Sequence, residues 1–197
     1  MRHRQVQVPP VTYVQSRAVL AKRHRGIRAY GFKCLVPDIE NRYRFDVAAL
    51  VSQLRVRGYQ VVALRRRDVL AQALSFLHAK GRKQWHLRTG DARVFDPLAI
   101  DPAELITMLD RIESRRARFD AIVSHVEHVE VVYEDDLVNA ADHQPTIDRV
   151  CSELGLPVAP VQTNMERVAP ESMPQRVRNY DEIVEALGQS RFAHLLR

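Results

Sequence analysis

The sequence predicts an α/β fold with a mostly parallel sheet, on the strength of three observations. Short apolar runs rich in valine alternate along the chain with longer amphipathic segments. The run YQVVALR, residues 59–65, is apolar on both faces, as in a strand that helices cover on both sides. Gly58 and Gly155 each follow an amphipathic segment and mark the end of a helix. We therefore expect a three-layer sandwich with parallel strands near residues 28–36, 59–65 and 129–133.

The amphipathic segments are expected to form helices over residues 16–26, 45–58, 68–82, 101–126, 145–155 and 179–196. Asp46 and Asp68 stand near the start of two of them, and aspartate is a preferred N-cap residue. The segment 101–126 has apolar residues at helical spacing: Ile106, Leu109, Ile112, Phe119, Ile122 and Val126. Residues 83–97, which carry turn signals, and the proline-rich residues 156–175 are expected to be irregular.

The length of 197 residues predicts one domain, with a basic N-terminal segment over 1–27 and a core over 28–197. No stretch approaches the roughly 18 consecutive apolar residues of a membrane span, and the N-terminus does not resemble a secretory signal. Cys34 and Cys151 lie far apart and fit no metal-ligand spacing, so we expect two buried, reduced thiols. These observations favour a cytoplasmic protein.

The net charge of +6 favours an anionic partner. Arginine dominates the basic residues, and its planar guanidinium suits phosphate or sulfate better than lysine does. The chain lacks the interleaved basic and aromatic residues of nucleic-acid binders, so we rank nucleic acid low as a partner. His125 and His128 have a spacing seen in metal sites, but no third ligand is evident, so no metal is expected.

The arginines gather where a strand is expected to end and a helix to begin. Arg65, Arg66 and Arg67 precede the helix start at Asp68, and Ser75 follows about two turns later on the same side of that helix. Ligands of parallel sheets bind at the carboxyl ends of the strands, near helix N-termini. An arginine at this position and a serine hydroxyl on the helix can both bind the same phosphate group. Spacing alone leaves a second interpretation open, in which these are surface arginines and a solvated serine.

The stretch LRRRDVLAQALS resembles the segment that grips the 3′-phosphate of the donor nucleotide in sulfotransferases that use 3′-phosphoadenosine 5′-phosphosulfate (PAPS). It is most similar to the bacterial carbohydrate branch, which includes trehalose and nodulation-factor sulfotransferases. The resemblance implies that Arg67 and Ser75 bind the phosphate, with Arg66 beside them. It also implies a P-loop-nucleotide-hydrolase-like core, PAPS as the donor and no metal. The acceptor would be a hydroxyl on a carbohydrate or a similar molecule.

Further motifs keep the order of that family. These are YGFK at 30–33, QWH at 84–86, VVYEDDL at 131–137, IDRVCSELGLP at 147–157, and QRVRNYDEI with FAHLL near the C-terminus. The resemblance implies that the last segment folds back toward the nucleotide, where Arg176 and Arg178 would reach its phosphates, although a solvated surface position is equally compatible. Trp85 is expected either to stack on a sugar or purine or to pin its loop. His86 is a second candidate for contact with the acceptor.

The family's phosphate loop, a glycine-containing turn resembling PRSGTT, has no counterpart before Gly31. The general base usually lies shortly after that loop, so no catalytic residue is assigned. The expectation is either a sulfotransferase that transfers sulfate poorly as this chain stands, or a non-catalytic relative. Such a relative would bind adenosine 3′,5′-bisphosphate or serve as a partner subunit. A missing strand would leave an open edge, which favours pairing with a second copy.

Two further groups have a structural and a catalytic interpretation. Glu134 and Asp135 resemble a pair of acids, but adjacent strand residues point to opposite faces, which favours a role in orienting arginines or in capping. His78 and His86 lie near the donor segment, where a histidine can transfer protons. An ordinary surface or hydrogen-bonded histidine is the favoured interpretation for both.

Overall fold

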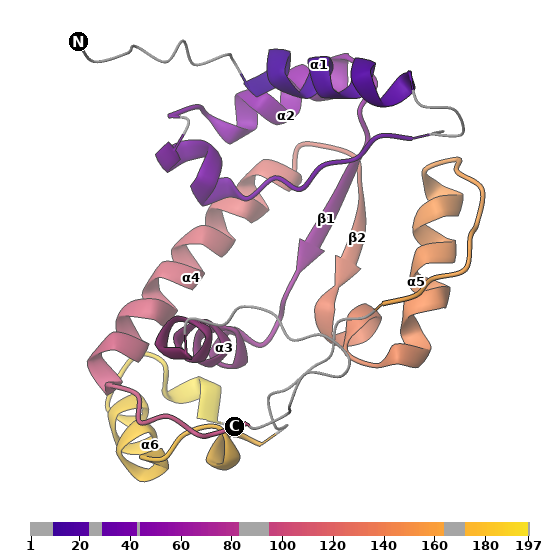
Figure 1. Ribbon diagram of the computed structural model, residues 1–197. Helices are drawn as coiled ribbons and strands as arrows, with labels where there is room; N and C mark the ends of the chain where they lie inside the picture. Colours follow the sequence, from indigo (N-terminus) through magenta and orange to yellow (C-terminus); the bar gives the residue numbers. More distant parts are fainter. Residues whose placement is uncertain (1–9, 24–28, 43, 83–94, 164–171, 197) are drawn as a thin grey trace. The chain divides into compact units, whose positions relative to one another are not determined.

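The computed structural model describes residues 10–23, 29–42, 44–82, 95–163 and 172–196 (Figure 1). Contacts divide the chain into two compact units. Unit 1 consists of Met1–Ala63, Ala117–Glu130 and Ile147–Ala159, and unit 2 consists of Leu64–Arg116, Val131–Thr146 and Pro160–Arg197. The expectation of a single domain stays a prediction. No helix among the described residues is both long enough and apolar enough to cross a lipid bilayer.

Unit 1 contains α1 (Pro10–Lys22), the turn η1 (Asp38–Arg42) and α2 (Val47–Val56). The side chain of Asp46 caps α2 by accepting a hydrogen bond from the backbone N–H of Ala49 at 3.1 Å, as the sequence predicts. Gly58, at a φ of 80°, follows the end of α2. Apolar residues of α1 and α2 form one buried cluster, Val11, Val14, Leu50 and Leu54.

The first expected strand, near residues 28–36, is wrong over the described residues 29–35, which form neither helix nor strand. A strand requires a neighbouring edge to pair with, and the sheet of the described residues holds only two strands. Phe32 instead contacts Tyr59 edge-on, with ring centroids 6.4 Å apart. Because this segment is outside the sheet, Cys34 is exposed rather than buried, and Cys151 is half-buried.

The other two expected strands are present as β1 (Val61–Arg65) and β2 (His128–Val132). They pair in a small sheet and run in the same direction (Figure 1). The turn η2 (Tyr133–Leu137) follows β2 directly, and α3 (Val69–Arg82) begins four residues after β1 ends. The carboxyl ends of both strands therefore lead into unit 2, where they lie at the same edge of the sheet. The coarse α/β prediction is confirmed.

Unit 2 is built on α3, α6 (Tyr180–Gly188), the short turns η3 (Met173–Gln175) and η4 (Ala193–Leu196), and the first part of α4 (Pro102–Val123). Their apolar faces form its core, which consists of Val69, Leu70, Ala73, Leu74, Leu77, Ile100, Leu105, Met108, Leu109, Ile112, Val177, Ile183, Leu187 and Phe192. The helix α5 (Ala140–Glu153) begins five residues before the expected start at Pro145, and Asn139 precedes it. The Asn139 carbonyl accepts from Asp142 N–H at 3.1 Å, and its side-chain amide donates to the Asp142 carboxylate at 3.0 Å.

Two segments far apart in the sequence are joined within unit 2. Leu98 and Val177 form a parallel bridge. The side chain of Asn179 accepts a hydrogen bond from Ile100 N–H at 3.0 Å and donates one to the Ile100 carbonyl at 2.9 Å. The segment that leads into α4 is thus fixed to the segment that leads into α6.

Candidate functional site

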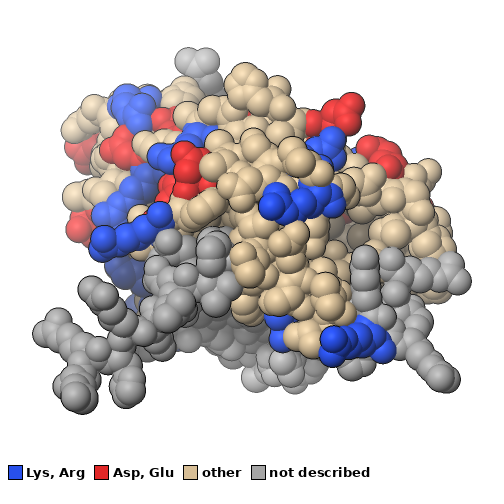
Figure 2. All heavy atoms as spheres, turned by 90° about the horizontal axis from the view of Figure 1, so that it is seen from above, with Lys and Arg blue, Asp and Glu red and all other residues tan. Residues whose placement is uncertain are grey.

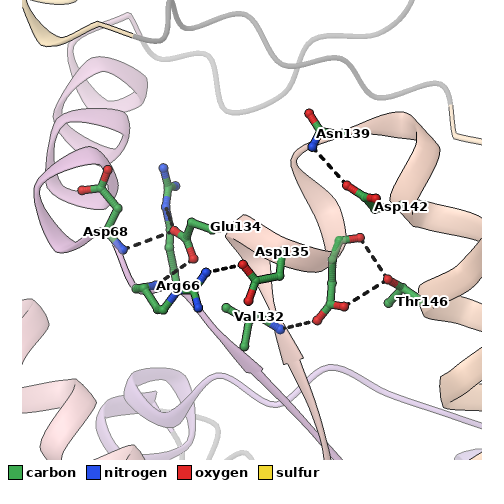
Figure 3. Close-up of polar contacts among 10 residues, drawn as sticks. Arg66, Asp68, Val132, Glu134, Asp135, Asn139, Asp142 and Thr146 are labelled. Carbon is green, nitrogen blue, oxygen red and sulfur yellow. Dashed lines mark hydrogen bonds and ion pairs between the residues drawn. The ribbon is translucent and has the colours of Figure 1, made fainter.

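Arg66 and Arg67 lie between the end of β1 and the start of α3, as the sequence predicts (Figure 3). Asp68 is the N-cap of α3, since its carboxylate accepts a hydrogen bond from the backbone N–H of Ala71 at 2.7 Å. The Arg66 side chain is 23% exposed and that of Arg67 is 56% exposed. The structure thus brings the arginines to the start of a helix, where the helix dipole favours a bound anion.

The anion at this helix start is Glu134, which follows β2. Its carboxylate accepts a hydrogen bond from the backbone N–H of Arg67 at 2.8 Å and another from that of Asp68 at 3.2 Å (Figure 3). The same carboxylate lies 3.6 Å from the Nε atom of Arg66, whose guanidinium stacks over the Tyr133 ring at 4.6 Å. The carboxylate of Glu134 therefore occupies the backbone N–H groups to which a phosphate would bind at this helix start.

These contacts change the acidity of Glu134. Burial by itself would raise the pKa of this carboxyl, but the N–H groups of Arg67 and Asp68, together with the guanidinium of Arg66, outweigh it. The pKa of Glu134 is consequently lower than the ordinary value of a glutamate. The group is a carboxylate at neutral pH, and its charge offsets that of Arg66.

Asp135, next to Glu134, forms an ion pair with the guanidinium of Arg67 (Figure 3). Both side chains are more than half exposed, so solvent screens this pair and ligands can reach it. The backbone carbonyl of Arg67 in turn accepts a hydrogen bond from the Arg116 guanidinium on α4 at 3.3 Å. Arg67 is thus held on two sides while its guanidinium remains accessible.

The expectation that Glu134 and Asp135 are adjacent strand residues on opposite faces is wrong. Both lie in η2, beyond the end of β2. The strand ends because Asp136 folds back and accepts a hydrogen bond from the backbone N–H of Val132 at 2.6 Å. The hydroxyl of the buried Thr146 on α5 donates to Asp136 at 3.2 Å and fixes the turn (Figure 3). In this turn, Glu134 and Asp135 both reach the arginine segment.

Ser75 is exposed on α3, seven residues beyond Asp68, which is about 10 Å along the helix axis. Among the described residues, its hydroxyl has no hydrogen-bond partner. A single phosphate that contacted both Arg67 and Ser75 would require the arginine side chain to extend along the helix. The exposure of both side chains is compatible with this arrangement.

The remaining arginines of the expected site belong to a second group in unit 2. Arg178 makes two hydrogen bonds to Asp96, at 2.8 and 3.0 Å, and these lower the pKa of Asp96. Arg176 is buried and lies beside His78, which is ten residues past Asp68, or about 15 Å along α3. The structure therefore does not place Arg176 beside Arg67.

His78 is buried against the ring of Phe95, with ring centroids 5.1 Å apart. Burial lowers the pKa of its imidazole; the main chain of Arg176 opposes this effect, and the guanidinium groups of Arg82 and Arg176 add to it. Neither ring nitrogen has a hydrogen-bond partner of good geometry among the described residues. His78 is thus a core histidine in contact with the main chain of Arg176, and the expectation of a surface position is wrong.

Trp85 and His86 lie outside the described residues. No group of histidine, cysteine, aspartate and glutamate side chains in the described part of the chain could hold a metal ion. On the face drawn in Figure 2, acidic side chains lie among the basic ones.

The expected role of Glu134 and Asp135 in capping and in orienting arginines is confirmed, although both lie in a turn and not in the strand. The signal for their position was available. The carboxyl ends of neighbouring parallel strands meet at one edge of a sheet, so acids after one strand and arginines after the next are expected to pair. The arrangement is able to hold an anion at Arg67, provided that the anion competes with Asp135 for the guanidinium.

Comparison of the chain with known proteins found no match: no family model, no curated protein and no solved structure matches it. The resemblance to PAPS-dependent sulfotransferases therefore stays a prediction that rests on its motifs.

Proposed function

We propose that this chain is a relative of the PAPS-dependent sulfotransferases and that the end of β1 binds the 3′-phosphate of the donor nucleotide. The placement of the arginines supports the proposal. Arg66 and Arg67 directly follow a strand of a parallel pair and precede a helix start, the position where open parallel sheets bind ligands. Arg67 is accessible, and its guanidinium can bind phosphate oxygens through two N–H groups.

The proposal specifies how the phosphate reaches the site. It displaces Asp135 from Arg67, while Glu134 keeps the backbone N–H groups at the start of α3. A doubly charged phosphate competes well with a single carboxylate for an exposed guanidinium. Ser75 then contributes its hydroxyl from the second turn of the helix. The two-strand sheet would belong to the three-layer sandwich and P-loop-like core that are typical of this family.

The donor would be PAPS, and the acceptor a hydroxyl on a carbohydrate or similar molecule. Sulfuryl transfer depends on fixed donors around the developing charge and on a base for the acceptor proton. The sequence shows no phosphate loop of the family type, so we expect slow transfer by residues 1–197. The second candidate is a non-catalytic relative that binds adenosine 3′,5′-bisphosphate. Such a relative could instead serve as a partner subunit, and the pairing of Arg66 and Arg67 with acids favours this role, because both cations are already neutralised.

Isothermal titration calorimetry with adenosine 3′,5′-bisphosphate tests the binding site. Arg67→Ala should weaken binding by about 1.5–3 kcal/mol, the range for a charge-assisted hydrogen bond. Arg191→Ala is the matched control, because Arg191 is a similarly exposed arginine that pairs with Asp110 elsewhere in unit 2. Adenosine 5′-monophosphate should bind more weakly than the bisphosphate. Equal affinity for the two nucleotides would contradict the assignment of Arg67 and Ser75 to the 3′-phosphate.

A turnover assay with radiolabelled PAPS and a sugar acceptor separates the two candidates. Loss of a single hydrogen-bond donor to the charge that develops in the transition state lowers the rate of an enzyme about 10²–10³-fold. A missing phosphate loop removes several such hydrogen-bond donors together. Residues 1–197 should therefore transfer sulfate very slowly, although they bind the nucleotide. Rapid turnover by these residues would show that another part of the chain replaces the loop.

A further inference from the structure

A groove lies between α3 and α4 in unit 2, away from the arginines at the end of β1. Its volume is about 470 Å³, within the range of sites for small organic molecules. Phe76 and Lys80, one turn apart, line it from α3, while Glu104, Met108 and Arg111 line it from α4. None of the residues assigned to the nucleotide contributes to this groove.

The groove offers an apolar surface. Met108 is buried, with 5% of its surface exposed, and it also belongs to the core of unit 2. Phe76 is 37% exposed, one of the large apolar side chains that remain in contact with solvent. Phe76 supplies the exposed ring and Met108 a polarizable thioether among the lining residues, and a flat apolar body packs well against such groups.

The charges around the groove are unequally neutralised. Lys80 and Glu104 form an ion pair at 2.6 Å across the two helices. Asp101 caps α4, since its carboxylate accepts a hydrogen bond from the backbone N–H of Ala103 at 3.0 Å. Arg111 is exposed, and among the described residues it has neither a hydrogen bond nor an ion pair. Asp101 keeps its negative charge, but it lies ten residues before Arg111, about 15 Å along α4, so among the described side chains Arg111 has no ionic partner at its own end of the groove.

We propose that this groove binds a small organic anion that carries an aromatic or flat apolar body and one sulfonate, sulfate or carboxylate group. The body lies against Phe76 and Met108, and the anionic group pairs with the guanidinium of Arg111. The guanidinium presents parallel N–H groups that match two oxygens of such a group. The volume suits a molecule of this size, and the single unpaired cation matches a single negative charge.

The test uses 2-naphthalenesulfonate as the probe, with the neutral 2-naphthalenemethanol and inorganic sulfate as its separate halves, in calorimetry on the full chain. The naphthalenesulfonate should bind at least about 10-fold more tightly than either half, because only the whole probe uses the apolar surface and the cation together. Sulfate binding as tightly as naphthalenesulfonate would overturn the apolar part of the proposal. Absence of binding at millimolar concentration would overturn all of it.

Two arginine variants assign the site. Arg111→Gln removes the charge, keeps most of the side chain and should abolish the preference for the charged probe over the neutral one. Arg115→Gln is the matched control, because Arg115 lies one turn further along α4, is exposed and also has no partner among the described residues. Equal losses in the two variants would show a general effect of surface charge and would overturn the proposal.

Two more variants complete the test. Phe76→Ser should weaken both aromatic probes about equally, because it removes apolar contact without changing the charge. Arg67→Ala should leave the binding of naphthalenesulfonate unchanged. The proposals for the groove and for the nucleotide site are therefore tested independently of each other. A loss in Arg67→Ala that equals the loss in Arg111→Gln would place the probe at the end of β1 and contradict the assignment to the groove.

Discussion

The carboxylate of Glu134 accepts a hydrogen bond from the backbone N–H of Arg67 at 2.8 Å, although 66 residues separate the two in the sequence. This contact connects the turn after β2 to the start of α3. It explains why the acids of the YEDD segment do not act as an isolated pair. Glu134 and Asp135 instead contact the backbone and side chains of Arg66, Arg67 and Asp68.

Replacement of Glu134 should reduce stability. Glu134→Ala leaves the N–H groups of Arg67 and Asp68 without their acceptor and should lower the free energy of unfolding by about 1–2 kcal/mol at pH 7. Urea unfolding followed by circular dichroism measures this change. Glu127→Ala is the control, because Glu127 is 95% exposed and its ion pair with Arg55 should contribute little. A loss in Glu127→Ala as large as that in Glu134→Ala would contradict the prediction.

The lowered pKa of Glu134 also predicts a pH dependence. Because the folded state binds this proton less readily than the unfolded state does, the stabilisation is fully present above the unfolded value near 4.5. It is lost as the pH falls through the lower folded value. Glu134→Gln cannot titrate, so its free energy of unfolding should decline less than that of the wild type between pH 5 and pH 3. Equal declines in both proteins would argue against a role of this carboxylate.

Asp135→Asn should increase the affinity for adenosine 3′,5′-bisphosphate. Asp135 competes with the nucleotide for the guanidinium of Arg67, and the asparagine removes the competing charge. An exposed ion pair is worth up to about 1 kcal/mol, so the dissociation constant in calorimetry should fall about 2- to 5-fold. Asp110→Asn, which breaks the exposed pair with Arg191, should leave the dissociation constant unchanged. Weaker binding in Asp135→Asn would mean that Asp135 contributes to the nucleotide site.

His78→Leu should reduce the loss of stability at mildly acidic pH. The pKa of His78 is lowered on folding, chiefly by burial, so the unfolded state takes up the proton first. The free energy of unfolding should therefore fall as the pH drops below the unfolded value near 6.5, until the folded value is passed. Thermal unfolding between pH 7.5 and pH 5 should show this fall in the wild type and a smaller fall in His78→Leu.

The control for His78 is His125→Leu, since His125 is exposed. Its stability should follow the pH dependence of the wild type. If His78→Leu shows the full wild-type dependence as well, the titrating group lies elsewhere. The leucine also removes two ring nitrogens that lack partners among the described residues, so His78→Leu should be at least as stable as the wild type at pH 7.5.

Asn179→Ala should destabilise unit 2. It removes both hydrogen bonds to the backbone of Ile100 and leaves a partly buried N–H and carbonyl unpaired, which costs about 1–3 kcal/mol. Urea unfolding measures the change. Gln189→Ala, which loses one exposed hydrogen bond to Glu185, should change the free energy of unfolding by less than about 0.5 kcal/mol. Asn179→Asp should be intermediate in effect, because it keeps the acceptor for Ile100 N–H.

The elements that local chemistry determines were predictable from the sequence. Asp46 and Asp68 start α2 and α3 because their carboxylates bond backbone N–H groups three residues on, a pattern visible in the sequence itself. The apolar run at 59–65 contains β1, but the expectation that helices cover both of its faces is wrong, because Val62 and Leu64 are 44% and 52% exposed. The expected helix start at residue 16 was wrong: α1 begins at Pro10, and the local signal was the proline itself, which is favoured in the first turn of a helix.

The features that depend on distant partners were not predictable in the same way. Residues 29–35 have the composition of a strand, but a strand forms only where another offers its edge. The acceptors for the start of α3 come from Glu134, and only the pairing of the two strands, not the residues around α3, indicates this contact. Phosphate binding by Arg67 and Ser75 likewise depends on a partner outside the chain, namely the nucleotide, and the assignment stays a prediction.

The burial of Phe192 has a consequence for the synthesis of the protein. Phe192 is fully buried in the same core as Leu74 and Leu109, so this core is complete only after residue 192 has been added. On the ribosome, the apolar faces of α3 and α4 stay uncovered while about 70 residues beyond the end of α4 are made, for several seconds at ordinary rates of translation. A nascent chain stalled before α6 should bind a chaperone that recognises apolar segments, and release past Phe192 should end that contact.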